Sequence, residues 1–208
     1  MEERYDPWNP LPAFIDVGER NRAFINNVVI TLNILNYSIC ESRKRSGGIS
    51  RFKPDRTERF LGKELGGTLL AFRSGKGVLV GLPGTLYLPL FLAHVQGYLS
   101  QVCGHFCPLS QINIQNIVIN SQILDDEGNE ARIDLNALHA RAPGVVCYTP
   151  EQFPGARLTL GHYSINLFQS GKYVLPGVKN MNGILEASHI FLHFFNQHRD
   201  AVLLPPAQ

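Results

Sequence analysis

Apolar and polar residues alternate along two stretches of this chain that share one pattern. Residues 24–34 read Phe-Ile-Asn-Asn-Val-Val-Ile-Thr-Leu-Asn-Ile, and residues 112–119 read Ile-Asn-Ile-Gln-Asn-Ile-Val-Ile. Both are rich in β-branched residues, alternate in part with a period of two, and place an Asn before two aliphatic residues. The pattern predicts one strand in each stretch, with an offset of 89 residues (116 − 27).

A hairpin pattern also occurs twice. Residues 72–76 read Phe-Arg-Ser-Gly-Lys and residues 168–172 read Phe-Gln-Ser-Gly-Lys, at a constant offset of 96 residues (168 − 72, 172 − 76). An alternating apolar strand precedes each Ser-Gly-Lys turn, a β-branched strand follows it, and the Gly can take the positive φ of such a turn. A constant offset over a whole unit indicates duplication.

Three further stretches predict helices. Residues 86–102 and 181–197 are unusually apolar, and each follows a hairpin, so each should cover one face of a sheet. Residues 131–142 carry Leu135 and Leu138 at helical spacing, whereas the corresponding residues 41–48 are polar and glycine-rich. We therefore expect this short helix in the second copy only.

These patterns divide the chain into four segments. Residues 1–22 contain three prolines and predict an irregular N-terminal arm, and residues 199–208 form a C-terminal tail. Residues 23–108 and 109–198 are the two repeats. Each repeat has roughly the 90 to 100 residues expected when a chain of this length consists of two fused half-domains.

The composition is that of an ordinary globular protein, with 44% hydrophobic residues, 17% charged residues and a net charge of +2. This charge is too small for a binder that relies on bulk electrostatics. From residue 77 to residue 124 there is no Asp, Glu, Lys or Arg, but prolines and glycines interrupt the apolar run, so we expect no membrane span. The acidic, proline-containing start predicts no secretory signal.

The four cysteines show no disulfide spacing, which predicts reduced thiols in an intracellular protein. Cys103 and Cys107 flank His105 and invite a metal interpretation, but the second half of a structural zinc motif is missing. We interpret Gly104 as a helix cap and expect no metal and no cofactor. The chain has no recognisable nucleophile motif or phosphate loop, so we predict that it is not an enzyme.

The duplicated motifs, taken together and in order, resemble the TATA-box-binding-protein family of general transcription initiation factors. In the first copy the matching motifs are Asn-Asn-Val-Val-Ile-Thr-Leu-Asn at residues 26–33 and Phe-Arg-Ser-Gly-Lys at 72–76. In the second they are Ile-Gln-Asn-Ile-Val at 114–118, Tyr-Thr-Pro-Glu-Gln-Phe-Pro-Gly at 148–155, and the stretch 168–179. The resemblance covers about residues 24–198.

The resemblance implies an α+β fold in which a ten-stranded antiparallel sheet curves into a saddle, with four helices on the convex face. It also implies that the concave face binds promoter DNA in the minor groove and bends it. The implied partners are a B-type initiation factor and RNA polymerase, and the implied location is the nucleus. Exposed apolar helices leave open a homodimer as well.

The resemblance assigns DNA-binding roles to individual residues. Phe72 would be one wedge between base steps, and Phe153, beside Pro154, would form a second wedge with Phe168. Asn27 and Asn116 would hydrogen-bond base acceptors. Aliphatic side chains would press on the groove floor, namely Val29, Leu70, Val78, Val80, Val118 and Val174. Lysines would meet phosphates, namely Lys63, Lys76, Lys172 and Lys179.

Several positions depart from the family pattern. Thr57 stands where a fourth wedge is expected, Val80 and Pro176 replace base-reading threonines, and Asn166 replaces an aliphatic residue of the groove floor. These changes predict relaxed or altered TATA specificity. Residues 86–102 lack the basic residues of the corresponding family helix, and Glu151 is retained from the acidic site for the B-type factor whereas Thr149 replaces the other acid.

Simpler interpretations stay open. Strand aromatics such as Phe72 and Phe168 are usually core residues, Lys76 and Lys172 could be solvated turn residues, and the two asparagines could be satisfied strand residues. The basic residues at 43–45 could be a nuclear-targeting patch, a phosphate contact or a solvated turn. The whole chain could be a protein-interaction module that kept the fold and lost strong DNA binding, or an accessory nucleic-acid domain.

Overall fold

The computed structural model describes residues 11–12, 14–18, 21–37, 50–52, 59–60, 63–64 and 67–205. It confirms the predicted α+β class, with an antiparallel sheet and four helices in the described part of the chain. The chain divides into two compact units. Unit 1 consists of Met1–Ala13 and Asn26–Ile117, and unit 2 consists of Phe14–Ile25 and Val118–Gln208.

Unit 1 contains a sheet in which the strands pair in the order β8-β2-β7-β6-β3. Their bounds are β2 (Asn21–Ile34), β3 (Ser50–Phe52), β6 (Thr68–Ala71), β7 (Lys76–Leu82) and β8 (Leu109–Gln122). Two short strands, β4 (Arg59–Phe60) and β5 (Lys63–Glu64), pair separately. β2 and β8 are both 14 residues long and continue into unit 2. The two strands predicted from the alternating stretches are therefore confirmed.

The predicted hairpin of unit 1 joins β6 to β7. The Phe72 N–H donates to the Lys76 carbonyl at 2.8 Å, and the Gly75 N–H donates to the Phe72 carbonyl at 2.9 Å. Gly75 has a φ of 78°, which glycine adopts without steric cost.

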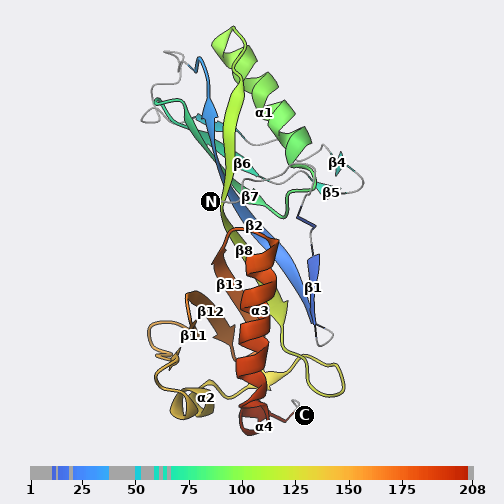
Figure 1. The fold of residues 1–208 in the computed structure, drawn as a ribbon, viewed down its shortest axis with the longest axis vertical. Helices are drawn as coiled ribbons and strands as arrows, with labels where there is room; N and C mark the ends of the chain where they lie inside the picture. The colour runs from blue at the N-terminus through green and yellow to red at the C-terminus, as the bar shows by residue number, and fades with distance from the viewer. Residues whose placement is uncertain are drawn as a thin grey trace. The chain divides into compact units, whose positions relative to one another are not determined.

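One long helix, α1 (Leu88–Cys103), follows the hairpin in unit 1 (Figure 1). A proline lies in its first turn, and Leu88, Phe91, Val95 and Leu99 form its buried stripe. Gly104 ends the helix with a φ of 73°, as predicted. Beyond this cap Cys107 is fully buried, and burial, together with a hydrogen bond to Cys103, raises the pKa of the Cys107 thiol to about 11.

Unit 2 repeats this arrangement with additions. Its strands pair in the order β10-β11-β12-β13-β8-β2, and β1 pairs with the first residues of β2. The strands are β1 (Phe14–Gly18), β10 (Val146–Cys147), β11 (Gly155–Leu160), β12 (Tyr163–Phe168) and β13 (Lys172–Val178), with a separate pair, β9 (Arg132–Ile133) and β14 (Leu203–Leu204). The helices are α2 (Leu135–Arg141), α3 (Met181–Asn196) and α4 (Arg199–Val202).

The predicted short helix of the second repeat is α2, whose N-cap Asp134 accepts a hydrogen bond from the Ala137 N–H at 2.9 Å. Its counterpart at residues 41–48 lies outside the described residues. One other expectation was wrong. Residues 14–18 of the expected irregular arm form β1. The expected tail contains α4 and β14.

α3 packs against β13 and β1 of unit 2 (Figure 1). Tyr173 lies 4.4 Å from Phe191 between ring centroids, and Phe191 lies 6.2 Å from Phe195. These three rings are fully buried. At the edge of this core the Tyr163 hydroxyl donates to Glu186 at 2.9 Å, and burial raises the pKa of Tyr163.

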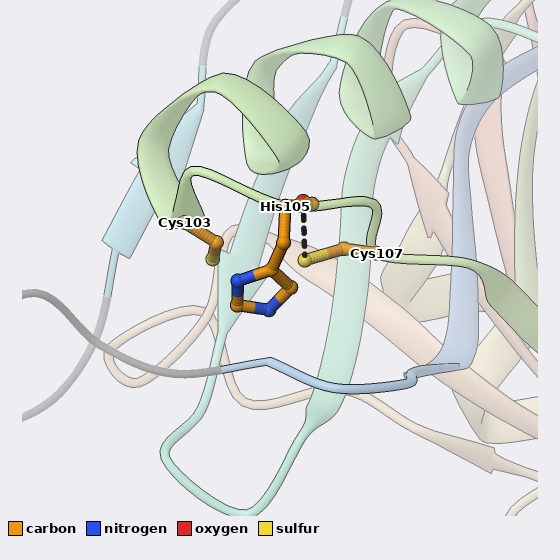
Figure 2. A group of neighbouring side chains, drawn as sticks. All are labelled: Cys103, His105 and Cys107. Carbon is orange, nitrogen blue, oxygen red and sulfur yellow. Dashed lines mark hydrogen bonds between the residues drawn. The ribbon is translucent and has the colours of Figure 1, made fainter.

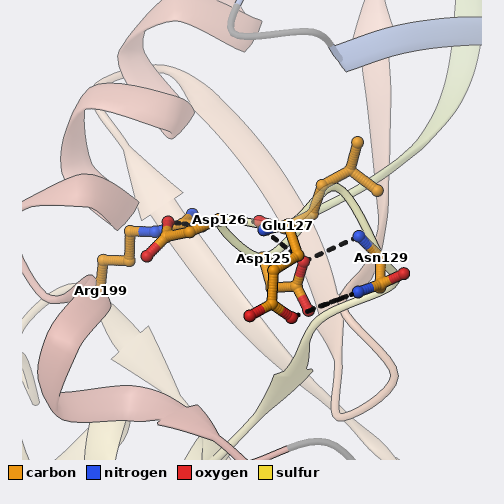
Figure 3. Close-up of polar contacts among 6 residues, drawn as sticks. Asp125, Asp126, Glu127, Asn129 and Arg199 are labelled. Atoms are coloured by element: carbon orange, nitrogen blue, oxygen red, sulfur yellow. Dashed lines mark hydrogen bonds and ion pairs between the residues drawn. The ribbon is translucent and has the colours of Figure 1, made fainter.

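The loop after β8 is hydrogen-bonded to α4, the last helix of unit 2 (Figure 3). Arg199 donates to the Leu124 carbonyl at 2.7 Å and to Asp126 at 3.0 Å. Within the loop, Asp125 accepts hydrogen bonds from the backbone N–H groups of Asn129 and Glu127, and the Asn129 bond is the largest cause of the lowered pKa of Asp125. A lowered carboxylate pKa stabilises the folded loop at neutral pH, and this contribution is lost as the pH falls through the folded-state pKa.

Within the described part of the chain, none of the helices is both long enough and apolar enough to cross a membrane.

The turn of the second hairpin yields a stability prediction. Gly171 has a φ of 76°, and a Cβ atom there would lie 2.5 Å from the Ala131 carbonyl oxygen and 2.7 Å from Gln122 Nε2. Gly161 is a matched control because its φ is 61° but no atom lies within 4 Å of its Cβ position. Gly161→Ala should cost roughly 1–2 kcal/mol of backbone strain, and Gly171→Ala should cost a further 1–3 kcal/mol or so from overpacking. Chemical denaturation followed by circular dichroism measures both, and equal losses would contradict the predicted clash.

Candidate nucleic-acid interface

Six of the predicted DNA-binding residues of unit 1 lie on the open face of its sheet. Each alternates with a fully buried neighbour, because successive side chains of a strand point to opposite faces. Val28 and Ile30 in β2 and Leu69 and Leu79 in the hairpin belong to the core. The predicted residues beside them are half-buried, namely Asn27, Val29, Leu70, Phe72, Val78 and Val80. They are therefore neither core residues nor fully exposed.

Strand pairing arranges this face in rows. Leu70 of β6 lies opposite Val78 of β7, and Val78 lies opposite Thr31 of β2. Thr31 Oγ1 in turn accepts a hydrogen bond from Gln115 Nε2 of β8 at 3.0 Å. One row thus crosses four strands and passes from apolar to polar side chains.

A second row in unit 1 borders a hollow of about 550 Å³. The Phe72 N–H donates to the Lys76 carbonyl across the turn, and Lys76 pairs with Asn33 in the ladder. Asn33 Nδ2 in turn donates to Gln111 Oε1 at 2.7 Å. The hollow therefore combines an aromatic ring, a lysine and a pair of amides on one patch.

Asn27 is held in a defined orientation. Its Oδ1 accepts the N–H of Gly81, in β7, at 2.7 Å. Because the oxygen is used inside the protein, the Nδ2 group is the donor that the amide can offer to a ligand. Asn116 lies at the corresponding position of β8 and is half-buried as well.

Unit 2 carries a matching hollow of about 580 Å³. Phe168, Ser170, Lys172 and Val174 line it, and Phe72, Ser74, Lys76 and Val78, each 96 positions earlier, line the hollow of unit 1. The long strands contribute equivalent residues as well. Asn120 and Gln122 of β8 line the second hollow, and Thr31 and Asn33 of β2, 89 positions earlier, line the first. The duplication therefore extends from the fold to the open face.

Phe153 and Phe168 meet as a pair in unit 2, as predicted. Their ring centroids lie 5.7 Å apart with an angle of 61° between the planes. Gly155 lies against both rings, since a Cβ there would be 2.9 Å from Phe153 and 3.0 Å from Phe168. Cζ of Arg157, a residue that no sequence motif marked, lies 5.3 Å from the centroid of the Phe153 ring.

The remaining predicted residues are distributed as follows. Val118 and Val174 are half-buried, and Pro154, Lys76, Lys172, Lys179 and Glu151 are exposed. Lys63 lies in β5. Thr57, the position of the missing wedge, lies outside the described residues.

The second face differs from the first at the position of Leu70. Asn166 lies between Arg157 and Val174 in the ladder, whereas its counterpart Leu70 faces Val78. The amide of Gln122 donates to the Ser170 carbonyl at 2.7 Å. The two halves thus share positions but differ in chemistry.

Two aromatic residues of this region had no sequence signal. Phe24 borders the second hollow, where its counterpart in the first hollow is Asn113. Phe14 of β1 packs against Phe24 with 6.5 Å between ring centroids, and Arg22 lies over Phe14. Only the pairing of β1 with β2 brings these side chains together.

Comparison with solved structures identifies the fold. The TBP of Methanococcus jannaschii matches with a TM-score of 0.59 over 84% of this chain and 98% of that one, at 22% sequence identity. The fold is therefore the duplicated α+β fold of TBP.

Sequence comparison identifies the family. The family model described as "Transcription factor TFIID (or TATA-binding protein, TBP)" matches residues 111–198. The TATA-box-binding protein of Thermococcus sibiricus is 30% identical over 132 residues, which cover 62% of this chain and 68% of that protein. That of Pyrococcus furiosus is 35% identical over 121 residues, and the match spans 60% of its length. The chain belongs to the TATA-box-binding protein family.

The contact between Gly155 and the ring pair can be tested directly. Gly155→Ala should force both rings to shift, at a cost of about 1–3 kcal/mol in unfolding free energy. Gly144→Ala is the control, because no atom lies within 4 Å of that Cβ position. Nuclear Overhauser contacts between the Phe153 and Phe168 rings should weaken in the first variant and persist in the second. Unchanged ring contacts in Gly155→Ala would contradict the predicted packing.

Proposed function

We propose that this protein is a general transcription initiation factor that binds promoter DNA in the minor groove and bends it. Family membership supports this proposal. The observation that carries it is the pair of matching hollows, each with a Phe, a Lys and a Val at equivalent positions of the two repeats. A surface that is duplicated together with its fold suits a ligand that is itself nearly twofold, as a short DNA duplex is.

The residue types suit the minor groove. Its floor offers mainly the acceptors of A·T pairs, and the Nδ2 group of Asn27 is a donor. Half-buried aliphatic side chains would contact the floor, and the Phe153–Phe168 pair would insert between base steps. Lys76 and Lys172 are exposed at the hairpin turns and would meet phosphates, which position the duplex without specifying its sequence.

We further propose that TATA specificity is altered, through departures from the family pattern in both units. Asn166 places an amide in the ladder where unit 1 has Leu70. Val80 and Pro176 supply no side-chain hydroxyl at the base-reading positions. The loss of each good base contact would reduce discrimination by about 1–3 kcal/mol.

Partner binding would involve Glu151 and α1. Glu151 is exposed and would contribute to the site for a B-type initiation factor, which would bring RNA polymerase. The uncharged α1 would have to meet partners through apolar and neutral polar contacts. A nuclear location and a homodimer through the apolar helices also belong to the proposal.

The first test compares A·T-rich with G·C-rich duplexes and measures bending by fluorescence energy transfer between labelled ends. The wild-type protein should prefer A·T-rich DNA and bend it. The Phe153→Ala/Phe168→Ala double variant should lose the kink, which is roughly 20–90° in proteins that insert apolar wedges. Phe194→Ala is the control, because it removes a half-buried ring from α3, away from the sheet strands.

Stability measurements complete this test. The double variant should unfold with a loss well below the roughly 3–5 kcal/mol of a single core Phe→Ala substitution, because neither ring is fully buried. If the wild-type protein neither prefers A·T-rich DNA nor bends it, the proposal fails. The alternative, a protein-interaction module that kept the fold, would then be favoured.

A second test measures the salt dependence of DNA binding. Lys76→Ala/Lys172→Ala should weaken binding to all duplexes about equally and reduce the slope of log K against log salt by about 2, one unit for each phosphate contact. Arg141→Ala removes an exposed charge from the end of α2 and should leave the slope unchanged. An unchanged slope in the double lysine variant would remove both residues from the interface.

A further inference from the structure

Three side chains with metal-binding atoms converge where α1 ends (Figure 2). Cys103 is the last residue of α1, and His105 and Cys107 follow in the segment before β8. One ligand atom from each residue lies within 4.8 Å of the other two. All three belong to unit 1, and none of them lines the hollow of the open face.

The backbone explains this convergence. Gly104 takes a left-handed conformation, so the chain reverses directly after the helix. The Cys107 N–H then donates to Ser100 Oγ at 3.2 Å, which anchors the returning segment on the last turn of α1. The two sulfur atoms are therefore held on the same side of the helix end.

His105 is oriented by a residue from another strand. Its Nε2 lies 2.7 Å from the carbonyl oxygen of Asn36, in the turn after β2. A carbonyl can only accept, so Nε2 carries the proton and Nδ1 keeps its lone pair. A backbone carbonyl that fixes the far nitrogen of a histidine is a common feature of metal-binding sites.

We propose that Cys103, His105 and Cys107 bind one Zn²⁺ ion through their two sulfur atoms and Nδ1. Two thiolates and an imidazole form a ligand set that zinc prefers in tetrahedral geometry. Binding would release the two thiol protons. Cys107 is buried, Cys103 is half-exposed and His105 is exposed, so the fourth position of the ion faces solvent.

Such an ion would join two parts of unit 1. Through His105 it would link the end of α1 to the turn after β2, and through Cys107 it would link the helix to the start of β8. Because an ion that binds only the folded state stabilises it, Zn²⁺ should raise the thermal midpoint of the protein.

The spacing of these three ligands differs from that of known zinc motifs. For this reason the sequence predicted no metal site. Structural motifs use two separated ligand pairs, whereas these ligands lie at every second position of one segment. A disulfide between Cys103 and Cys107 and an unligated cluster are the competing states.

The experiment titrates CoCl₂ into the reduced full-length protein, because Co²⁺ reports sulfur ligation and tetrahedral geometry by its absorption. The expected result is one Co²⁺ per chain with a sulfur-to-cobalt charge-transfer band, displaced by ZnCl₂. Zn²⁺ should also raise the thermal midpoint. Absence of the charge-transfer band would overturn the proposal, as would a Cys103–Cys107 disulfide that dissolved oxygen forms in the presence of Zn²⁺.

Two variants avoid the buried cysteine, whose loss could prevent folding. Cys103→Ser and His105→Ala should each weaken Co²⁺ binding by at least about 100-fold. The loss of a residue that only supports a ligand costs up to about 100-fold in metal affinity, and the loss of a ligand itself should cost at least as much. Cys147→Ser removes an exposed thiol of unit 2 and should bind Co²⁺ like the wild type. Wild-type affinity in Cys103→Ser or His105→Ala would also refute the site. None of these readouts depends on DNA binding.

Discussion

Successive side chains of a β-strand point to opposite faces, and the rest of this structure depends on that constraint. In β2, Val28, Ile30 and Leu32 fill the core, so Asn27, Val29 and Thr31 are left on the open face. A shift of one residue in register would exchange the two sets and bury the amides. Because burying an unpaired amide is unfavourable, the core that stabilises each unit also fixes which residues a ligand can meet.

Both units have the same alternation of side chains along their strands, but the residues on their open faces are only partly the same. The hairpin turns of both units keep a Phe, a Ser, a Lys and a Val at the rim of a hollow. Beside them, Leu70 is replaced by Asn166 and Thr31 by Asn120. The shared positions lie at the rims of the two hollows, where Phe72 and Phe168 are half-buried and Lys76 and Lys172 are exposed. The two units therefore keep the same fold although the side chains beside their hollows differ.

The helix ends show how distant contacts decide local chemistry. The reversal at Gly104 follows from one glycine, but the orientation of His105 requires a carbonyl 69 residues away in the chain. Similarly, Arg199 of α4 holds the loop after β8, 73 residues away, through Asp126. Such contacts orient side chains in ways that no local pattern specifies.

The sequence by itself determined the duplication, the hairpins and the three main helices, because alternation, turn glycines and repeated motifs can be read directly along the chain. The residues of the open face were assigned through the resemblance to the family, whose motifs the sequence carries. Only the tertiary structure decided the rest. β1 is short and follows three prolines, so its strand character comes from pairing with β2. The resemblance implied that Phe153 and Phe168 form a pair, but their contact depends on the pairing of Gly155 with Phe168 in the ladder. Arg157 and the cluster of Cys103, His105 and Cys107 likewise depend on which backbone segments lie side by side. That is set by the packing of the whole unit, which no local pattern encodes.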